Sequence, residues 1–211
     1  MTYPLAPDGV YWTIQGEGTL TGTPMAFIRL AGCSVGCAEC DTNYSLADTV
    51  DLPTLHQRVL EVTPASFRPQ RFSAEDGPWV WITGGEPTDH DLLPLIDLLA
   101  TTHRIALCTS GTHDSVRGCG PIIDHPGVRW VSVSPHQVLK GLHGHEVKLV
   151  PGLGALYWED LNDLDWVRHF AHKWVQPLAG SREELQHAIT WVQEHPGWKL
   201  STQAHKTWAI K

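Results

Sequence analysis

The fold of this 211-residue chain is decided by residues 25–42, which read MAFIRLAGCSVGCAECDT. The stretch begins with mostly apolar residues, Met25–Leu30, which predict a β-strand. The strand leads directly into Cys33, Cys37 and Cys40. Their spacing of four and then three residues predicts that the thiols lie on one side of a tight, helix-like turn. Thiols clustered after a strand in this way indicate one shared inorganic cluster.

The number of thiols predicts the kind of cluster. Four cysteines close a 4Fe-4S cluster that serves as an electron carrier, whereas three cysteines leave one iron with an open position for a small molecule. We therefore predict a 4Fe-4S cluster held by Cys33, Cys37 and Cys40. Two alternatives stay open at this point, a structural zinc site completed by a histidine and a set of unrelated buried thiols. Zinc sites usually pair two Cys-x-x-Cys motifs, and this chain has a single one.

Composition limits the classes of function. Hydrophobic residues make up 42% of the chain, which predicts that residues 1–211 bury one core and form a single domain. The formal charge of -8 argues against nucleic-acid binding, and the sequence has no signal-peptide pattern and no apolar stretch long enough for a membrane. Cys108 and Cys119 are isolated, so no disulfide framework is expected and we predict a reducing, cytoplasmic location. The expected ligand is a small molecule.

Predicted strands and helices alternate after the cysteine loop. Further strands are predicted at 79–83, 105–109, 130–134, 146–150, 173–176 and 198–202, with helices at 51–62, 91–102, 159–170 and 181–195 and a loop at 63–78. This alternation is typical of an α/β fold with a parallel sheet. The strands are too few for a closed eight-stranded barrel. We therefore predict an incomplete, curved parallel (β/α) barrel of about six to seven strands with few helices.

Glycines or polar residues follow several of the predicted strands. In a parallel sheet such segments meet at the carboxyl ends of the strands, where the sites of these folds lie. Each motif alone is an ordinary turn. Next to an open iron, however, Gly85 would give close approach to a ligand and Glu86 would accept from its ammonium group. The motifs are Gly84–Pro87, Thr109–Thr112, Ser134–His136 and Gln176–Pro177.

A cysteine loop followed by Gly-Gly-Glu-Pro resembles the radical S-adenosylmethionine superfamily. Within it, nearly the whole chain resembles the 7-carboxy-7-deazaguanine synthase family, through residues 14–18, 27–33, 40–42, 82–87, 109–112, 132–135, 176–177 and 203–206. The resemblance implies a homodimeric lyase of 7-deazapurine (queuosine) biosynthesis. Its reaction would convert 6-carboxy-5,6,7,8-tetrahydropterin to 7-carboxy-7-deazaguanine with loss of ammonia, started by one electron from a flavodoxin-like donor.

The same resemblance implies the residues of the site. S-Adenosylmethionine would be contacted by Glu39, Cys40, Asp41, Gly85, Ser134, Pro135, His136 and Gln176, and the pterin by Ile14, Gln15, Gly16, Arg29 and Thr83. Magnesium would be held by Thr42, with substrate and water oxygens completing its octahedron. Arg29 suits a substrate carboxylate, because a guanidinium binds a carboxylate in a bidentate fork.

Three positions depart from the usual pattern, and two other functions stay open. Glu39 stands where the superfamily commonly has an aromatic residue, His136 where the family often has lysine, and Ala204 where it often has threonine. A glycyl-radical activating enzyme can carry the same cysteine spacing but gives no reason for residues 15–17 and 203–205. An iron-sulfur electron carrier gives no reason for an open iron beside Gly-Gly-Glu-Pro.

Overall fold

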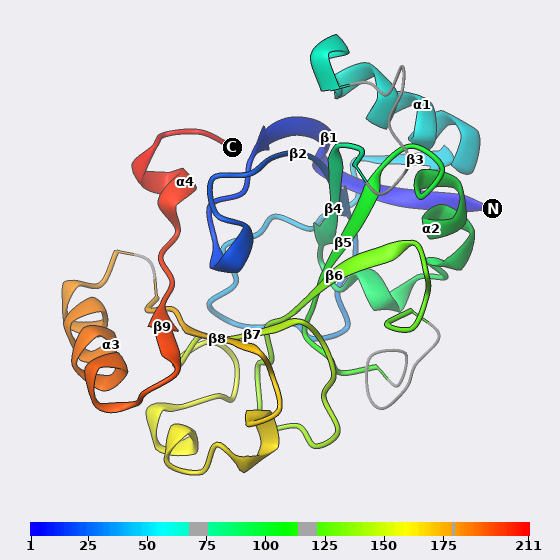
Figure 1. The fold of residues 1–211 in the computed structure, drawn as a ribbon. Coiled ribbons are helices and arrows are strands. Elements are labelled where there is room, and N and C mark those ends of the chain that lie inside the picture. The colour runs from blue at the N-terminus through cyan, green and yellow to red at the C-terminus, as the bar shows by residue number, and fades with distance from the viewer. Residues whose placement is uncertain (68–75, 114–121, 179) are drawn as a thin grey trace.

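One curved sheet forms the body of the molecule (Figure 1). The computed structural model describes residues 1–67, 76–113, 122–178 and 180–211, so Cys119 and half of the predicted loop at 63–78 lie outside the described residues. Within those ranges the sheet has nine strands in the order β3-β1-β2-β4-β5-β6-β7-β8-β9. No pairing joins β3 to β9 in the described ranges, so the barrel is open.

The parallel part of the sheet matches the prediction. Every pairing from β2 to β9 is parallel, and the strands follow one another in chain order. An incomplete, curved parallel barrel is therefore confirmed. The strands are β2 (Pro24–Leu30), β4 (Trp79–Gly84), β5 (Arg104–Thr109), β6 (Val128–Val133), β7 (Glu146–Leu149), β8 (His172–Val175) and β9 (Trp198–Leu200).

Two antiparallel strands were not predicted. β1 (Thr2–Ile14) pairs with β2 on one side and with β3 (Asp48–Asp51) on the other, both antiparallel. Pro4, Pro7 and Gly9 interrupt the apolar pattern of β1, and prolines argue against a central strand. The register of β1 shifts between Leu5 and Val10, and the residues that break the pattern lie in or next to this irregularity.

Three of the four predicted helices form, and each is shorter than predicted. α1 (Leu52–Val62) begins after Asp51, whose side chain accepts from Thr54 N, and α3 (Arg182–Glu194) begins after Ser181, whose Oγ accepts from Glu184 N at 3.1 Å. Both caps confirm the predicted starts. α2 covers only Leu93–Leu99, because Thr101 and Thr102 turn back to the last carbonyl groups of the helix. α4 (Ala204–Thr207) was not predicted.

The helix predicted at 159–170 is wrong. The segment forms two short 3₁₀ turns, Trp158–Asn162 and Asp165–Val167. Asp163 lies between them, and its side chain accepts from the backbone N–H of Asp165 at 3.1 Å. Asn and Asp side chains compete in this way with helical backbone bonds, so a stretch dense in them breaks into turns.

Alternate side chains of the sheet point into two apolar groups. On the outer face, residues such as Ile28 and Ile82 pack beneath α1 and α2, which lie around the outside of the curve in Figure 1. On the inner face, Phe27, Trp81 and Ala106 belong to a smaller group that fills one end of the open barrel. The other end is left for polar residues.

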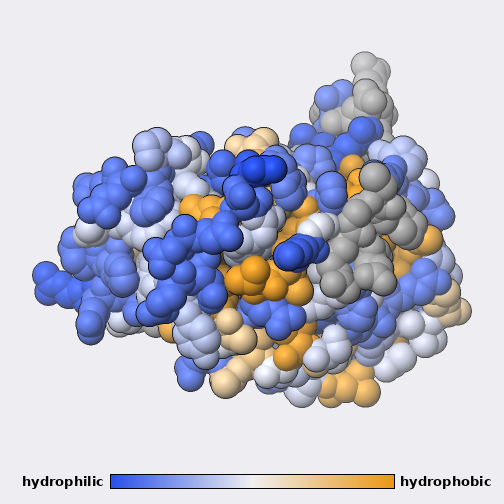
Figure 2. Space-filling view, turned by 90° about the horizontal axis from the view of Figure 1, so that it is seen from below, coloured by the Kyte–Doolittle hydropathy of each residue, from blue (hydrophilic) through white to orange (hydrophobic). Residues whose placement is uncertain are grey.

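The surface is largely polar. Hydrophilic residues cover most of the face shown in Figure 2, and hydrophobic residues gather in smaller groups near its centre. Of the helices in the described ranges, none has the length and apolar character needed to cross a bilayer.

Candidate active site

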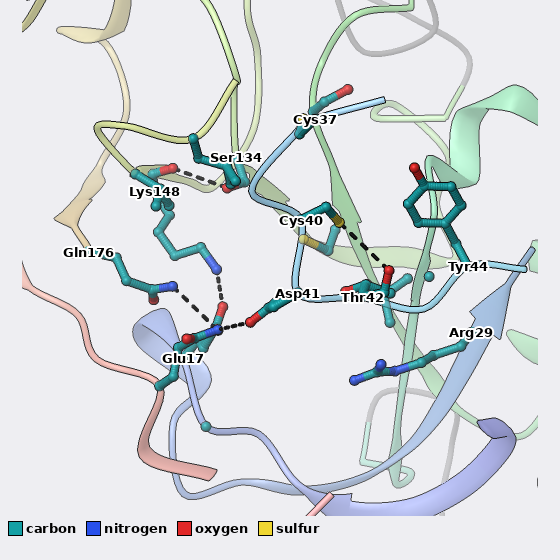
Figure 3. Close-up of a pocket in the computed structure, with 18 of the residues that line it drawn as sticks. Glu17, Arg29, Cys37, Cys40, Asp41, Thr42, Tyr44, Ser134, Lys148 and Gln176 are labelled. Carbon is teal, nitrogen blue, oxygen red and sulfur yellow. Dashed lines mark hydrogen bonds and ion pairs between the residues drawn. The ribbon is translucent and has the colours of Figure 1, made fainter. Parts of the chain in front are cut away.

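A cavity of about 620 Å³ opens at the carboxyl ends of the parallel strands (Figure 3). Its wall draws on the cysteine loop, the segments that follow β4, β5, β6 and β8, and the segment just before α4. The structure thus brings together motifs that are far apart in the sequence. Of the site residues proposed from the sequence, all line this cavity except Pro135, which is buried behind it.

The three clustered thiols open into this cavity. Cys33, Cys37 and Cys40 all line it, and burial together with the neighbouring Cys40 and Cys33 raises the pKa of the Cys37 thiol. The loop that carries them has no helix, which corrects the predicted helix-like turn. In the described ranges, no group of three or more His, Cys, Asp or Glu residues is arranged to hold a metal ion. The three thiols therefore line one cavity without forming a complete metal site.

The cysteine loop is anchored at its first turn. Ser34 donates from its backbone N–H and its hydroxyl to Asp89, at 2.7 and 2.6 Å. The backbone N–H of Gly85 donates to Leu30 O at 3.0 Å, and a Cβ on Gly85 would collide with the carbonyl of Gly32. Gly85 is therefore needed for the close packing of its own chain against the loop, whereas the sequence assigned it to approach of a ligand.

Glu86 is a buried junction between two strand ends. Its carboxylate accepts five hydrogen bonds, from Thr88 N and Oγ1, Thr109 Oγ1, and Ser110 N and Oγ, at 2.5 to 3.0 Å. The residue is 2% exposed. These donors join the end of β4 to the end of β5. The carboxylate is therefore already engaged by the protein, which differs from the free acceptor expected from the sequence.

Sequence reasoning missed a charged pair on one wall of the cavity. Lys148, on β7, forms an ion pair with Glu17, which follows β1 (Figure 3). Burial alone would raise the pKa of Glu17, but the Lys148 ammonium and the Gln203 amide hold it below its ordinary value. Burial opposes the charge of Lys148 as well, yet the facing Glu17 raises the pKa of Lys148 above its ordinary value. Both groups are therefore charged at neutral pH.

The same wall carries two residues proposed for S-adenosylmethionine. Gln176 Nε2 lies 3.4 Å from Glu17 Oε1, and its Oε1 accepts from Ser201 at 2.9 Å. His136 has its Nδ1 buried without a hydrogen-bond partner in the part of the chain that the structure describes. Burial lowers the pKa of His136, so its ring is neutral near pH 7. A buried ring nitrogen beside the cavity is suited to a hydrogen bond with a ligand.

The opposite wall carries a second cation, Arg29 (Figure 3). Arg29 pairs in register with Thr83 of β4, so the two residues are neighbours on adjacent strands. Its Nε donates to the hydroxyl of Tyr11 at 2.9 Å, and its NH1 lies 3.8 Å from an Asp8 oxygen. Most N–H donors of the Arg29 guanidinium therefore remain available to a ligand.

The remaining proposed residues lie between these walls. Gln15 is 5% exposed, and its Oε1 accepts from the backbone N–H groups of Gly16 and Glu17, so only its NH₂ group is left for a ligand. A Cβ on Gly16 would collide with His205, which fixes glycine at that position. The hydroxyl of Thr42 has no hydrogen-bond partner in the described ranges, which leaves its oxygen available to a cation.

The donor set fits the cofactors that the sequence suggests. Three thiols on one wall suit an iron-sulfur cluster, and the unpartnered His136 nitrogen suits a polar organic ligand beside it. A single hydroxyl from Thr42 can serve Mg²⁺ only if other oxygens complete the shell. Glu17 lies within the motif at residues 14–18, and Lys148 is a charge flanked by valine and leucine in a predicted strand, so each carried a signal. No signal linked Gln203 to either of them.

Comparisons with known proteins agree with this geometry. The chain is 41% identical to the 7-carboxy-7-deazaguanine synthase of Escherichia coli K12 over 159 residues, which are 70% of this chain and 66% of that protein, or about two thirds of its length. The 7-carboxy-7-deazaguanine synthase of Burkholderia multivorans is 32% identical over 223 residues, which cover 98% of each chain. The crystal structure of QueE from Escherichia coli superposes with a TM-score of 0.65 at 30% identity, covering 97% of this chain and 95% of that one. No protein-family model matches the chain.

Proposed function

The chain belongs to the 7-carboxy-7-deazaguanine synthase family, and we propose that it converts 6-carboxy-5,6,7,8-tetrahydropterin to 7-carboxy-7-deazaguanine with loss of ammonia. It is a radical S-adenosylmethionine lyase of 7-deazapurine biosynthesis. The observation that carries the proposal is one cavity lined by three thiols and, on another wall, by a guanidinium with donors to spare. Thiols suit a cluster, and the guanidinium suits a carboxylated substrate.

The cofactors follow from the donors around the cavity. Cys33, Cys37 and Cys40 would hold a 4Fe-4S cluster, and Thr42 would supply one ligand to Mg²⁺. When bound, the cluster and S-adenosylmethionine supply the radical that removes hydrogen from C6 of the pterin. The protein orients the reactants and keeps water from them.

We retain the S-adenosylmethionine contacts proposed from the sequence, with changes of role where the structure calls for them. Glu86 would act indirectly, as a positioning residue, because its five hydrogen bonds hold together the strand ends that carry neighbouring cavity residues. We leave direct contacts to the other residues of the set that line the cavity, whereas Pro135, which is buried and does not line it, would support its neighbours Ser134 and His136. The direct set is Glu39, Cys40, Asp41, Gly85, Ser134, His136 and Gln176.

The pterin contacts rest on charge and hydrogen bonding. Arg29 would take the substrate carboxylate in a bidentate fork, next to the hydroxyl of Thr83. Backbone groups of Ile14 and Gly16, with the NH₂ of Gln15, would match the donors and acceptors of the pyrimidinone edge. Orientation matters because a small displacement of the reacting carbon can cost orders of magnitude in rate.

The proposal extends to partners and location. A flavodoxin-like protein would supply the electron, and two copies of the chain would form a homodimer in the cytoplasm. The partner set includes neither a nucleic acid nor a membrane, since the formal charge of -8 disfavours a phosphate grip.

The test is product formation by the anaerobically reconstituted protein. We expect 7-carboxy-7-deazaguanine, identified by mass, on incubation with S-adenosylmethionine, a reductant and 6-carboxytetrahydropterin. A Cys37→Ala variant should fail to bind the cluster and to form product. Cleavage of S-adenosylmethionine by wild type with the pterin left unchanged would contradict the proposed substrate. Stoichiometric zinc in place of iron would contradict the cluster.

A further inference from the structure

Gln203, in the segment between β9 and α4, joins two walls of the cavity. Its Nε2 donates to Glu17 Oε1 at 2.9 Å and to Asp41 Oδ2 at 2.9 Å. Its Oε1 accepts from Lys206 Nζ at 2.7 Å. A single amide therefore uses both N–H groups and its oxygen on three charged side chains.

The two carboxylates that Gln203 bridges belong to different parts of the site. Asp41 directly follows Cys40 in the cysteine loop, whereas Glu17 forms the ion pair with Lys148 on the far wall. Figure 3 shows this chain of contacts from Lys148 through Glu17 to Asp41. Carboxylates brought this close repel each other, and the amide supplies one donor to each without carrying a charge of its own.

The rest of the cysteine loop is weakly held. In the described ranges, the backbone hydrogen bonds of residues 37–44 run from Cys40 N to Cys37 O at 3.3 Å and from Gly32 N to Tyr44 O at 2.9 Å. Asp41 also receives Lys206 Nζ, at 2.5 Å, but both partners of that pair are about half exposed. Segments with few buried contacts open locally at low cost, so the side-chain bonds of Asp41 decide the position of this stretch.

Gln203 is itself fixed from behind. The backbone N–H of Ala204 donates to Gly16 O at 2.9 Å, and a Cβ on Gly16 would collide with His205. The start of α4 thus packs directly on the segment that carries Glu17. Because Gln203 is fixed in this way, its hydrogen bond to Asp41 fixes the position of the cysteine loop relative to Glu17.

We propose that Gln203 is a positioning residue that holds the cysteine loop in register with the pterin side of the cavity. Neither cofactor nor substrate need touch it. The consequence for chemistry rests on the proposed function: if the loop shifts, the bound cofactor and the pterin lose their alignment. S-Adenosylmethionine would then be cleaved without conversion of the substrate.

The first test needs no cofactor. In the cluster-free protein, Gln203→Met removes the polar contacts but keeps the approximate length of the side chain. Hydrogen exchange of residues 38–44 should become about tenfold faster, as expected for loss of one charge-assisted hydrogen bond. Gln57→Met is the matched control, because Gln57 donates to the Glu61 carboxylate at 2.9 Å on the exposed face of α1. Exchange in the loop should not change in that control.

The second test uses the reconstituted enzyme. Gln203→Met should bind iron as wild type does but release several-fold more 5′-deoxyadenosine for each 7-carboxy-7-deazaguanine formed. Gln203→Asn keeps the amide on a shorter side chain, so its ratio of 5′-deoxyadenosine to product should lie between those of Gln203→Met and wild type. The inference would be overturned if hydrogen exchange of residues 38–44 were unchanged in Gln203→Met. It would also be overturned if this variant released no more 5′-deoxyadenosine for each 7-carboxy-7-deazaguanine than wild type does. A wild type that forms no product would instead overturn the proposed function, and the exchange experiment would still test the bridge.

Discussion

Two cations face the same cavity, and the protein treats them differently. Lys148 has a side chain that is 9% exposed and is held in an ion pair by Glu17. Arg29 has a side chain that is 25% exposed, a neutral phenol as its hydrogen-bond partner, and an Asp8 carboxylate 3.8 Å away that is itself 43% exposed. The charge of buried Lys148 is neutralised within the fold, whereas the charge of the partly exposed Arg29 is not.

The difference teaches which charge can serve a ligand. Moving a carboxylate of the substrate onto Lys148 would require breaking a desolvated pair and leaving Glu17 with no counter-charge. Arg29 can turn its fork to a carboxylate at little cost, because its pairing with Asp8 is long and partly in solvent. We therefore expect Lys148 to matter mainly for the stability and electrostatics of the site, and Arg29 mainly for the substrate.

The largest effect should come from breaking the buried pair. Lys148→Met leaves Glu17 as an unpaired buried carboxylate, which typically costs about 3 kcal/mol or more in the free energy of unfolding. Urea unfolding of the cluster-free protein, followed by tryptophan fluorescence, measures this loss. The double variant Glu17→Gln/Lys148→Met should recover a large part of it, because neither buried charge remains. Equal stability of Lys148→Met and wild type would show that the pair is not desolvated.

The dependence of this loss on pH has a defined sign. In wild type the pKa of folded Glu17 is lowered, so its contribution to stability is present above the unfolded pKa and is lost as pH falls through the folded pKa. Without Lys148 the same burial raises the pKa of Glu17, so protonation stabilises the variant as pH falls. The gap in unfolding free energy between the two proteins should therefore narrow between neutral and acid pH. A gap that widens on acidification would contradict the ion pair.

The next largest effect should come from Arg29. Arg29→Ala removes the proposed carboxylate fork, and loss of a charge-assisted contact lowers affinity by roughly ten- to a hundredfold. We expect kcat/KM for 6-carboxytetrahydropterin to fall by this factor, with S-adenosylmethionine binding and stability close to those of wild type. Arg29→Lys should recover only part, because an ammonium lacks the planar fork. If wild type processes the pterin without its carboxylate equally well, Arg29 is not the anchor.

The contrast between the two cations also marks what the sequence could predict. Arg29 ends a recognisable strand just before the cysteine loop, so its place at the cavity followed from local pattern. The partners of Glu17 did not, because Lys148 lies 131 residues away in the chain and Gln203 lies 186 away. Side-chain pairs at such separations depend on the register and curvature of the whole sheet.

The same division holds for the fold. The parallel strands, and the helix starts at Asp51 and Ser181, were predictable because apolar runs and capping side chains act locally. β1 was missed because its prolines mask a strand that tertiary pairing stabilises, and the helix at 159–170 was overpredicted because the Asp163 side chain accepts from the backbone N–H of Asp165. The position of Glu86 at the cavity could be predicted from its motif, but its five hydrogen bonds could not, because their donors come from two different strand ends.

The smallest effect should come from the phenol that orients Arg29. Tyr11→Phe removes the acceptor of Arg29 Nε at 2.9 Å but keeps the ring that stacks on Phe27. Burial raises the pKa of Tyr11 against the opposing influence of the Arg29 guanidinium, so the phenol is neutral at physiological pH and donates no charge to the contact. Tyr11 acts on the substrate only through the orientation of Arg29, whose fork remains in the variant, so we expect a smaller loss of about 0.5–1.5 kcal/mol, which corresponds to a roughly two- to tenfold rise in KM for the carboxylated pterin. Tyr3→Phe is the matched control, because Tyr3 OH donates to Asp91 O at 3.0 Å outside the cavity, and it should lower stability without changing KM. A rise in KM that is as large in Tyr3→Phe as in Tyr11→Phe would mean that the phenol acts on folding alone, and that Arg29 needs no support to receive the substrate.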